Sequence, residues 1–157
     1  MSITGTLAAL QTRLVALPSP TVPVRVYADP KESVSLGEFP CIILCLAPGV
    51  EHRLSEVTMG SPGFGYHAYT VGIYVLLGQR ATNIAELHSR ALPWPAALYT
   101  KLVADLTLGG TVVSIGSGEA TEPLMTYTLG PITWADGVYW GLKCLLPVSE
   151  KLSVPIG

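Results

Sequence analysis

Apolar residues near the start of the chain recur at helical spacing. They are four or three residues apart, at Ile3, Leu7, Leu10, Leu14 and Leu17. This spacing puts them on one face of a helix. The stripe predicts an amphipathic N-terminal helix whose apolar face packs against a core, and Pro18 follows the last of these residues and ends it.

Four stretches with strand character come next. Valines alternate with other residues over 22–28, which predicts a half-buried strand. Residues 39–46 are apolar on both faces and predict a central strand covered on both sides. Residues 51–59 alternate weakly and residues 66–77 alternate clearly. We expect this last pair to form a long β-hairpin, part of which extends beyond the core.

A broken helix occupies the middle of the chain. Apolar positions over residues 81–92 follow helical spacing, and the Pro-Trp-Pro sequence at 93–95 interrupts it. A second helix is expected to begin at Pro95 and to carry Leu98, Leu102 and Leu106 on one face. A short strand at residues 111–115 follows.

The chain then forms a closing hairpin of residues 124–134 and 138–148. Asp136-Gly137 lies between the two strands and is a strong hairpin-turn signal. The apolar phase of the first strand slips by one residue at Gly130-Pro131, for which a β-bulge is the expected cause. The full pattern predicts one α+β domain over residues 1–157, with a mainly antiparallel sheet, helices packed on one face and a long β-hairpin.

Charged residues make up only 13% of the 157-residue chain, about half the usual share. A monomer with so few charges would expose much apolar surface, so we expect a homo-oligomer. The uncharged run of most interest, residues 61–79, contains glycines, a proline and a histidine and does not suit a membrane span. The net charge of −2 and the absence of a basic run argue against direct nucleic-acid binding.

No catalytic or cofactor motif is recognisable in the sequence. The histidines at 52, 67 and 88 do not form a zinc pattern, and the three cysteines do not suit a disulfide framework. Glu119 and Glu122 flank a short loop, where carboxylates are usually solvated. We therefore expect no enzyme activity, no cofactor and no metal site.

Trp134, Tyr139 and Trp140 crowd the closing hairpin and would suit a platform for stacking a ligand. Alternation, however, puts Trp140 on the face of Leu142 and Tyr139 on the opposite face. Core packing for Trp140 and a subunit contact for Tyr139 are the favoured interpretations.

The order of elements resembles the tail terminator (tail completion) proteins of long-tailed bacteriophages over nearly the whole chain. The resemblance lies in the N-terminal and mid-chain helices and in three sequences. These are "FPCIIL" (39–44), "YTVGIYVLL" (69–77) and "YTLGPITWADGVYWGLKCLLPV" (127–148). It implies a hexameric ring that caps the tail tube, ends its polymerisation and joins the tail to the head.

The implied partners are the tail tube protein and head-tail connector or neck proteins. The implied location is the head-proximal end of the virion tail, and the host cytoplasm during assembly. From this sequence alone, the expected interface residues are Glu51, Arg53, Glu56, Met59, Phe64, Arg80, Trp94 and Tyr139. Another phage neck or tail component, or a small non-catalytic ligand-binding module, remains an alternative.

Overall fold

The computed structural model describes residues 3–29, 38–54, 63–79, 84–110, 112–116, 123–134 and 137–154. Three helices and seven strands lie within these residues. In chain order they are α1 (Ile3–Leu14), β1 (Arg25–Tyr27), β2 (Cys41–Leu46), β3 (Arg53–Leu54), β4 (Gly63–Gln79), α2 (Ile84–Ala91), α3 (Trp94–Val103), β5 (Ser114–Ile115), β6 (Thr126–Trp134) and β7 (Gly137–Val154).

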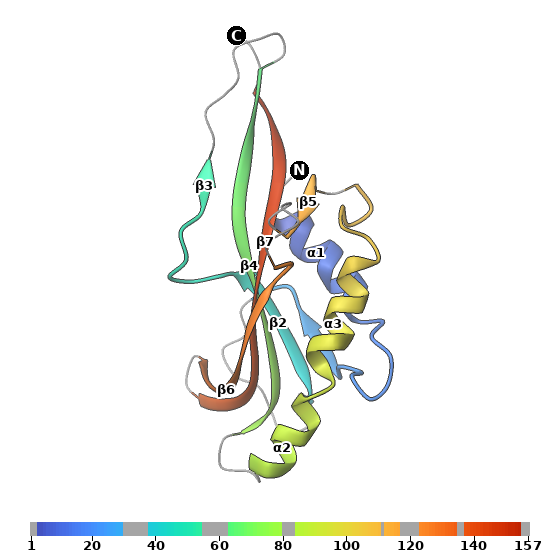
Figure 1. Cartoon of the computed structure of the whole chain (residues 1–157). Helices are drawn as coiled ribbons and strands as arrows, with labels where there is room; N and C mark the ends of the chain where they lie inside the picture. The colour runs from blue at the N-terminus through green and yellow to red at the C-terminus, as the bar shows by residue number, and fades with distance from the viewer. Residues whose placement is uncertain are drawn as a thin grey trace.

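The strands form one mixed sheet around a long central pair. The main strand order is β1-β2-β4-β7-β5, with β3 also paired to β4 and β6 also paired to β7. β1 runs parallel to β2, and the other pairs are antiparallel. β4 and β7 pair from Gly63 opposite Val154 to Gln79 opposite Tyr139. In Figure 1 this pair forms the long axis of the molecule and rises above the helices.

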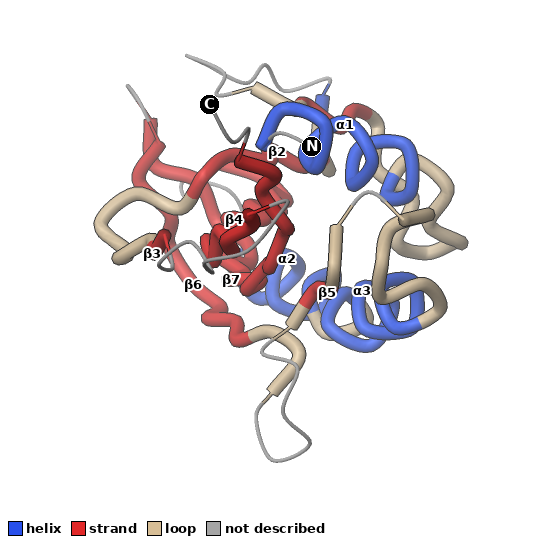
Figure 2. The backbone as a smooth tube through the Cα atoms, turned by 90° about the horizontal axis from the view of Figure 1, so that it is seen from above, coloured by secondary structure: helices blue, strands red, loops and turns tan. Residues whose placement is uncertain are grey.

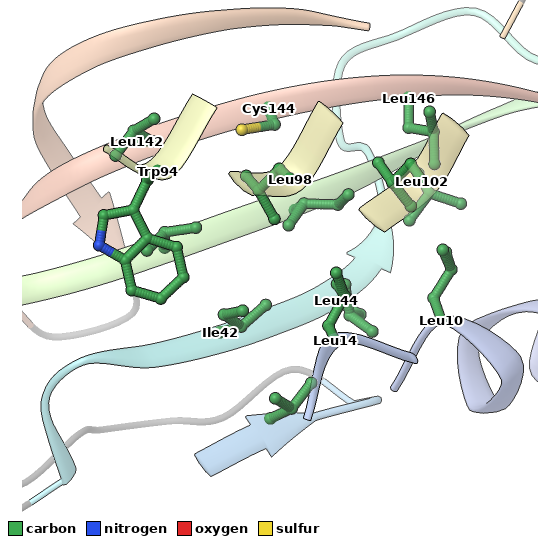
Figure 3. Packing of buried hydrophobic residues seen from close by; sticks show 14 of the residues in the cluster. Leu10, Leu14, Ile42, Leu44, Trp94, Leu98, Leu102, Leu142, Cys144 and Leu146 are labelled. Carbon is green, nitrogen blue, oxygen red and sulfur yellow. The ribbon is translucent and has the colours of Figure 1, made fainter. Parts of the chain in front are cut away.

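The main core lies between the helices and one face of the sheet. Viewed from above, the helices gather on one side of the strands (Figure 2). Figure 3 shows leucines of α1 and α3 and the indole of Trp94 facing side chains of β2 and β7. Leu14, Leu98, Ile42 and Leu142 are each fully buried there. The apolar stripes of the helices thus pack against every second residue of the strands. The removal of both sets of side chains from water stabilises the packing of the helices on the sheet.

A second, smaller core covers part of the opposite face. It contains the residues of β2 that point away from the helices, together with aromatic and apolar side chains of β4, β6 and β7: Cys41, Ile43, Cys45, Tyr74, Leu76, Ile132 and Tyr139. Trp134 packs against this cluster, with its ring centroid 4.8 Å from that of Tyr74. β2 is therefore apolar on both faces because both faces are covered, as the sequence predicts.

The single-domain α+β fold with helices on one face and a long hairpin-like strand pair is confirmed. The Pro-Trp-Pro break is also confirmed, since α2 ends at Ala91 and α3 begins at Trp94 after an N-cap at Pro93. The predicted stripe on the second helix is too long, because α3 ends at Val103 and Leu106 is exposed.

The predicted bulge at Gly130-Pro131 is wrong. Pairing of β6 with β7 continues without a shift from Leu129 opposite Leu142 to Ile132 opposite Tyr139. The apolar phase changes because the first half of β6 shares the helix-side face of Leu142, whereas its second half supplies the second core. The register shift lies instead in β4, between Leu76 and Gly78.

Two further strand predictions need correction. The long partner of β4 is β7, which continues to Val154. In the expected partner at 51–59 the structure describes residues 51–54, and of these Arg53 and Leu54 pair with β4. Val22 and Val24 are exposed, unlike the buried Val26, because β1 begins only at Arg25. In the closing hairpin, Gly137 pairs with Trp134 and so belongs to β7 and not to the turn.

Gly141 of β7 lies where the backbone of β4 comes closest. A Cβ atom at this position would stand 1.8 Å from the carbonyl oxygen of Val75, next to the register shift in β4. No side-chain rotation relieves a clash with backbone, so glycine is required here.

We expect Gly141→Ala to lower the free energy of unfolding by on the order of 3 kcal/mol, because the central strand pair must separate locally. Urea unfolding monitored by tryptophan fluorescence measures this. Gly109→Ala is the matched control. Its Cβ would meet nothing within 4 Å, and only its positive φ of 71° opposes the change, at a cost of about 1 kcal/mol. Equal stability of the two variants would contradict the expectation.

Candidate interaction surface

The start of β4, at Gly63, and the end of β7, at Val154, form a two-stranded arm. β2 reaches only to Val71 of β4, and β3 pairs with Ala68 and His67. On the other side, β5 pairs with Val148 and Ser149 of β7. Beyond these contacts, no third strand joins the ribbon within the described residues, and it projects past the helical layer (Figure 1). A ribbon of two strands is only marginally stable by itself in water, so the arm is suited to contact with a neighbour.

A buried polar cluster lies at the base of this arm. The hydroxyls of Thr6 on α1 and Tyr69 on β4 are 2.7 Å apart. The Tyr69 hydroxyl also donates to the Glu150 carboxylate of β7 at 3.2 Å. His67 Nδ1 lies 3.7 Å from the other carboxylate oxygen. Glu150 is only 1% exposed. A buried carboxylate requires such partners, so the cluster ties α1 to the base of the arm.

Burial also raises the pKa of the Tyr69 hydroxyl in this cluster and of the Cys144 thiol in the main core. Removal from water, together with the nearby Glu150 carboxylate, raises the pKa of Tyr69 to about 12, although the Thr6 hydroxyl opposes this. Burial likewise raises the pKa of the Cys144 thiol to about 12. A thiol that stays protonated at neutral pH is a poor nucleophile. These groups are therefore suited to structure more than to proton transfer.

The sequence-predicted interface residues fall into three groups. Glu51 and Arg53 lie beside and within β3, and their side chains are 78% and 77% exposed. Trp94 and Tyr139 are buried, at 1% and 3% exposure. Trp94 belongs to the main core and Tyr139 to the second core, so neither side chain offers surface to a neighbour.

For the remaining predicted residues, the structure describes the backbone at most. Phe64 lies within β4, where it pairs with Ser153 of β7. Glu56, Met59 and Arg80 lie outside the described residues, as do Glu119 and Glu122. Of the eight expected interface residues, only Glu51 and Arg53 are thus seen to be exposed and close together. Their Nε and Oε1 atoms are 3.9 Å apart.

A hollow of about 380 Å³ lies beside β6, on the sheet face away from the helices. Its lining includes the aromatic pair Tyr74 and Trp134, the hydroxyl residues Thr128 and Thr133, and Lys143. Lys143 of β7 stands directly between Thr128 of β6 and Tyr74 of β4 in the sheet register. Within the described part of the chain, no acidic side chain lies within ion-pair distance of Lys143. The hollow can therefore accept a negatively charged group from outside.

Sequence reasoning missed Thr6, Glu150 and Lys143 as residues of interest. Thr6 lies three residues after Ile3 and four before Leu10, so it is part of the buried helix stripe. Glu150 continues the inward phase of Leu146 and Val148, but the strand was expected to end at 148. Lys143 alternates with inward residues of β7, so the sequence pattern predicts only an ordinary outward-facing lysine. The hollow beside it depends on the path of β6.

Comparison with known proteins does not place the chain in a family. No protein-family model matches the sequence, and no curated protein matches it. No helix in the described part of the chain is long and apolar enough to cross a membrane. The described residues also contain no group of three or more His, Cys, Asp or Glu side chains that could hold a metal ion.

The polar cluster predicts the effect of removing one hydroxyl. Tyr69→Phe deletes both hydrogen bonds of that group and leaves the buried Glu150 carboxylate with His67 alone. We expect the free energy of unfolding to fall by about 1–3 kcal/mol. Urea unfolding measures the loss. Tyr99→Phe, at an exposed tyrosine of α3, should change stability by less than about 0.5 kcal/mol. A Tyr69→Phe protein as stable as wild type would show that the cluster adds nothing.

The raised pKa of Tyr69 also predicts a pH dependence. The folded protein holds the phenolic proton up to about pH 12, whereas the unfolded chain releases it near pH 10. Unfolding therefore releases a proton in this interval, and stability falls as the pH rises through it. Urea midpoints of wild type and Tyr69→Phe, measured from about pH 8 to pH 11, should approach each other with rising pH. A constant difference would contradict the assignment.

Proposed function

We propose that this chain is a structural virion protein that forms a ring, with six copies as the expected number. The ring would cap the tail tube of a long-tailed bacteriophage, end tube polymerisation and join the tail to the head. Its partners would be the tail tube protein and connector or neck proteins. The proposal assigns no catalytic step, cofactor or nucleic-acid contact to the chain. The phage context rests on the resemblance in the order of elements.

The observation that carries the proposed ring is the pair of unlike open sides of the sheet. Within the described residues, one side ends in β1 and β3, and the other ends in β5 and β6. Strand edges present unpaired backbone groups and readily pair with another chain. Two different patches that bind each other produce a head-to-tail contact, and such contacts close into rings when the rotation permits. One chain with two unlike edges therefore suits a cyclic assembly.

The exposed apolar side chains support the same proposal. Large apolar residues are exposed on α3, on β6 and ahead of β1, among them Tyr99, Val103, Tyr127 and Val24. Only 13% of the chain is charged. A surface of this kind is better suited to burial in an assembly than to free solution. Another neck or tail component of a phage would share these features and is the second candidate.

Mass in solution tests the ring. Light scattering should give a particle of about 100 kDa, six times the 16.6 kDa chain, and negative-stain electron microscopy should show a ring with a central opening. Arg53→Glu should impair assembly and leave the unfolding midpoint unchanged, because the Arg53 side chain is 77% exposed. The control is Arg90→Glu, at a 62% exposed arginine of α2 and away from both open sides of the sheet, which should assemble like the wild type. A wild-type chain that stays monomeric at all concentrations would overturn the ring.

A further inference from the structure

β6 is an edge strand that lacks the usual protection against pairing. Its nine residues, Thr126–Trp134, contain no charged side chain. Among the described strands, it pairs only with β7. Soluble proteins usually place lysine or other charges on such an edge. Pro131 lacks an N–H and limits further pairing to the part before it, where Thr126 to Leu129 are all exposed. This four-residue segment is open to an added strand.

The two faces of this segment differ in chemistry. Tyr127 and Leu129 lie opposite Cys144 and Leu142, on the helix side of the sheet, and are 51% and 36% exposed. Thr128 lies on the other face, in the same cross-strand row as Lys143. A strand added beside Thr128 would stand two strands from Lys143, or roughly 10 Å between backbones. A glutamate on it could span that distance toward the lysine.

The opposite side of the sheet offers a segment with matching chemistry. Residues 51–54 carry Glu51 and Arg53 in one alternating phase and Leu54 in the other. Both charged side chains are more than three-quarters exposed, and their 3.9 Å contact is a weak surface pair. Leu54 is 71% exposed. On its free side, β3 has no paired strand among the described residues.

We propose that residues 51–54 of one copy, which include β3, add to β6 of the next copy as an antiparallel strand. With Glu51 opposite Thr128, its carboxylate faces Lys143 across that row, and Arg53 falls opposite Thr126. The same register puts Leu54 opposite Met125 and diagonal to Tyr127, so apolar meets apolar. This inference rests on the proposed ring and names its subunit contact.

The strand directions agree with this pairing. β3 runs antiparallel to β4, as does β7, whereas β6 runs antiparallel to β7. Copies related by rotation about an axis near the strand direction therefore bring β3 and β6 together antiparallel. β3 pairs higher on the central ribbon than β6 does. Closure with this stagger requires strands tilted from the ring axis, as in closed barrels.

A charge exchange tests the contact. Lys143→Glu and Glu51→Lys each place like charges across the proposed interface, so each variant alone should need an about tenfold or higher protein concentration to assemble. An equal mixture of the two should assemble again, because alternating copies restore a lysine opposite a glutamate at every contact. The double variant should also assemble alone. Light scattering over a concentration series measures all four samples, and urea midpoints check that each variant folds.

The outcomes separate the two proposals. If the wild-type chain forms no ring, the proposed function fails and the contact fails with it. If wild type assembles but Glu51→Lys assembles equally well, the ring stands and the β3–β6 contact is overturned. Glu51 is exposed, so this variant decides the matter even if Lys143→Glu does not fold. If both single variants are impaired but the mixture is not restored, Lys143 instead receives a different anionic group, and the contact is likewise overturned.

Discussion

The pairing of β4 with β7 is the constraint on which the rest of the structure depends. The two strands stay in register over almost their whole length, with one shift between Leu76 and Gly78. That shift brings the Val75 carbonyl against Gly141 so closely that no side chain fits. Every other strand except β1 attaches directly to this pair. The residues of β4 and β7 therefore define both faces of the sheet, and the helices and β6 cover what those faces expose.

The two faces of this strand pair are covered by different elements. The helices supply leucines to one face, and the curled second half of β6 supplies Ile132 and Trp134 to the other. The helical layer ends near the first turn of α1, where Thr6 contacts Tyr69. At that level the inward phase of β7 changes from Val148 to Glu150. A polar cluster thus marks the boundary between the packed body and the arm, because a carboxylate there can be satisfied by hydroxyl and imidazole groups.

Local patterns in the sequence were sufficient for the fold class and for most elements. The stripe of α1, the two-sided apolar run of β2 and the proline break between α2 and α3 each have one physical interpretation, and each is confirmed. The local sequence patterns did not show which distant segments pair with each other. The alternation of residues 66–77 is satisfied equally by a neighbour at 51–59 or by one at 142–154. Only the complete sheet selects the second. The phase change in β6 was visible, but a bulge and a strand serving two cores produce the same pattern.

The candidate surface was harder to predict for a related reason. Trp94 was expected at an interface from its place at the broken helix, and Tyr139 because alternation put it on the face opposite Trp140. Both side chains instead fill a core, as large aromatic groups often do. Glu51 and Arg53 were expected there because they are charged in a chain with few charges, and both are exposed. Lys143 is also a charge among uncharged neighbours, but the hollow beside it is lined by Tyr74 of β4 and Trp134 of β6, whose contact the sequence does not reveal. Among these expected residues, charge therefore coincides with exposure and aromatic size with burial. Neither signal is sufficient by itself, because Glu150 is charged and buried whereas Tyr127 is aromatic and exposed. Only the pairing of distant strands shows which charges face an open side of the sheet, where the proposed neighbours would meet.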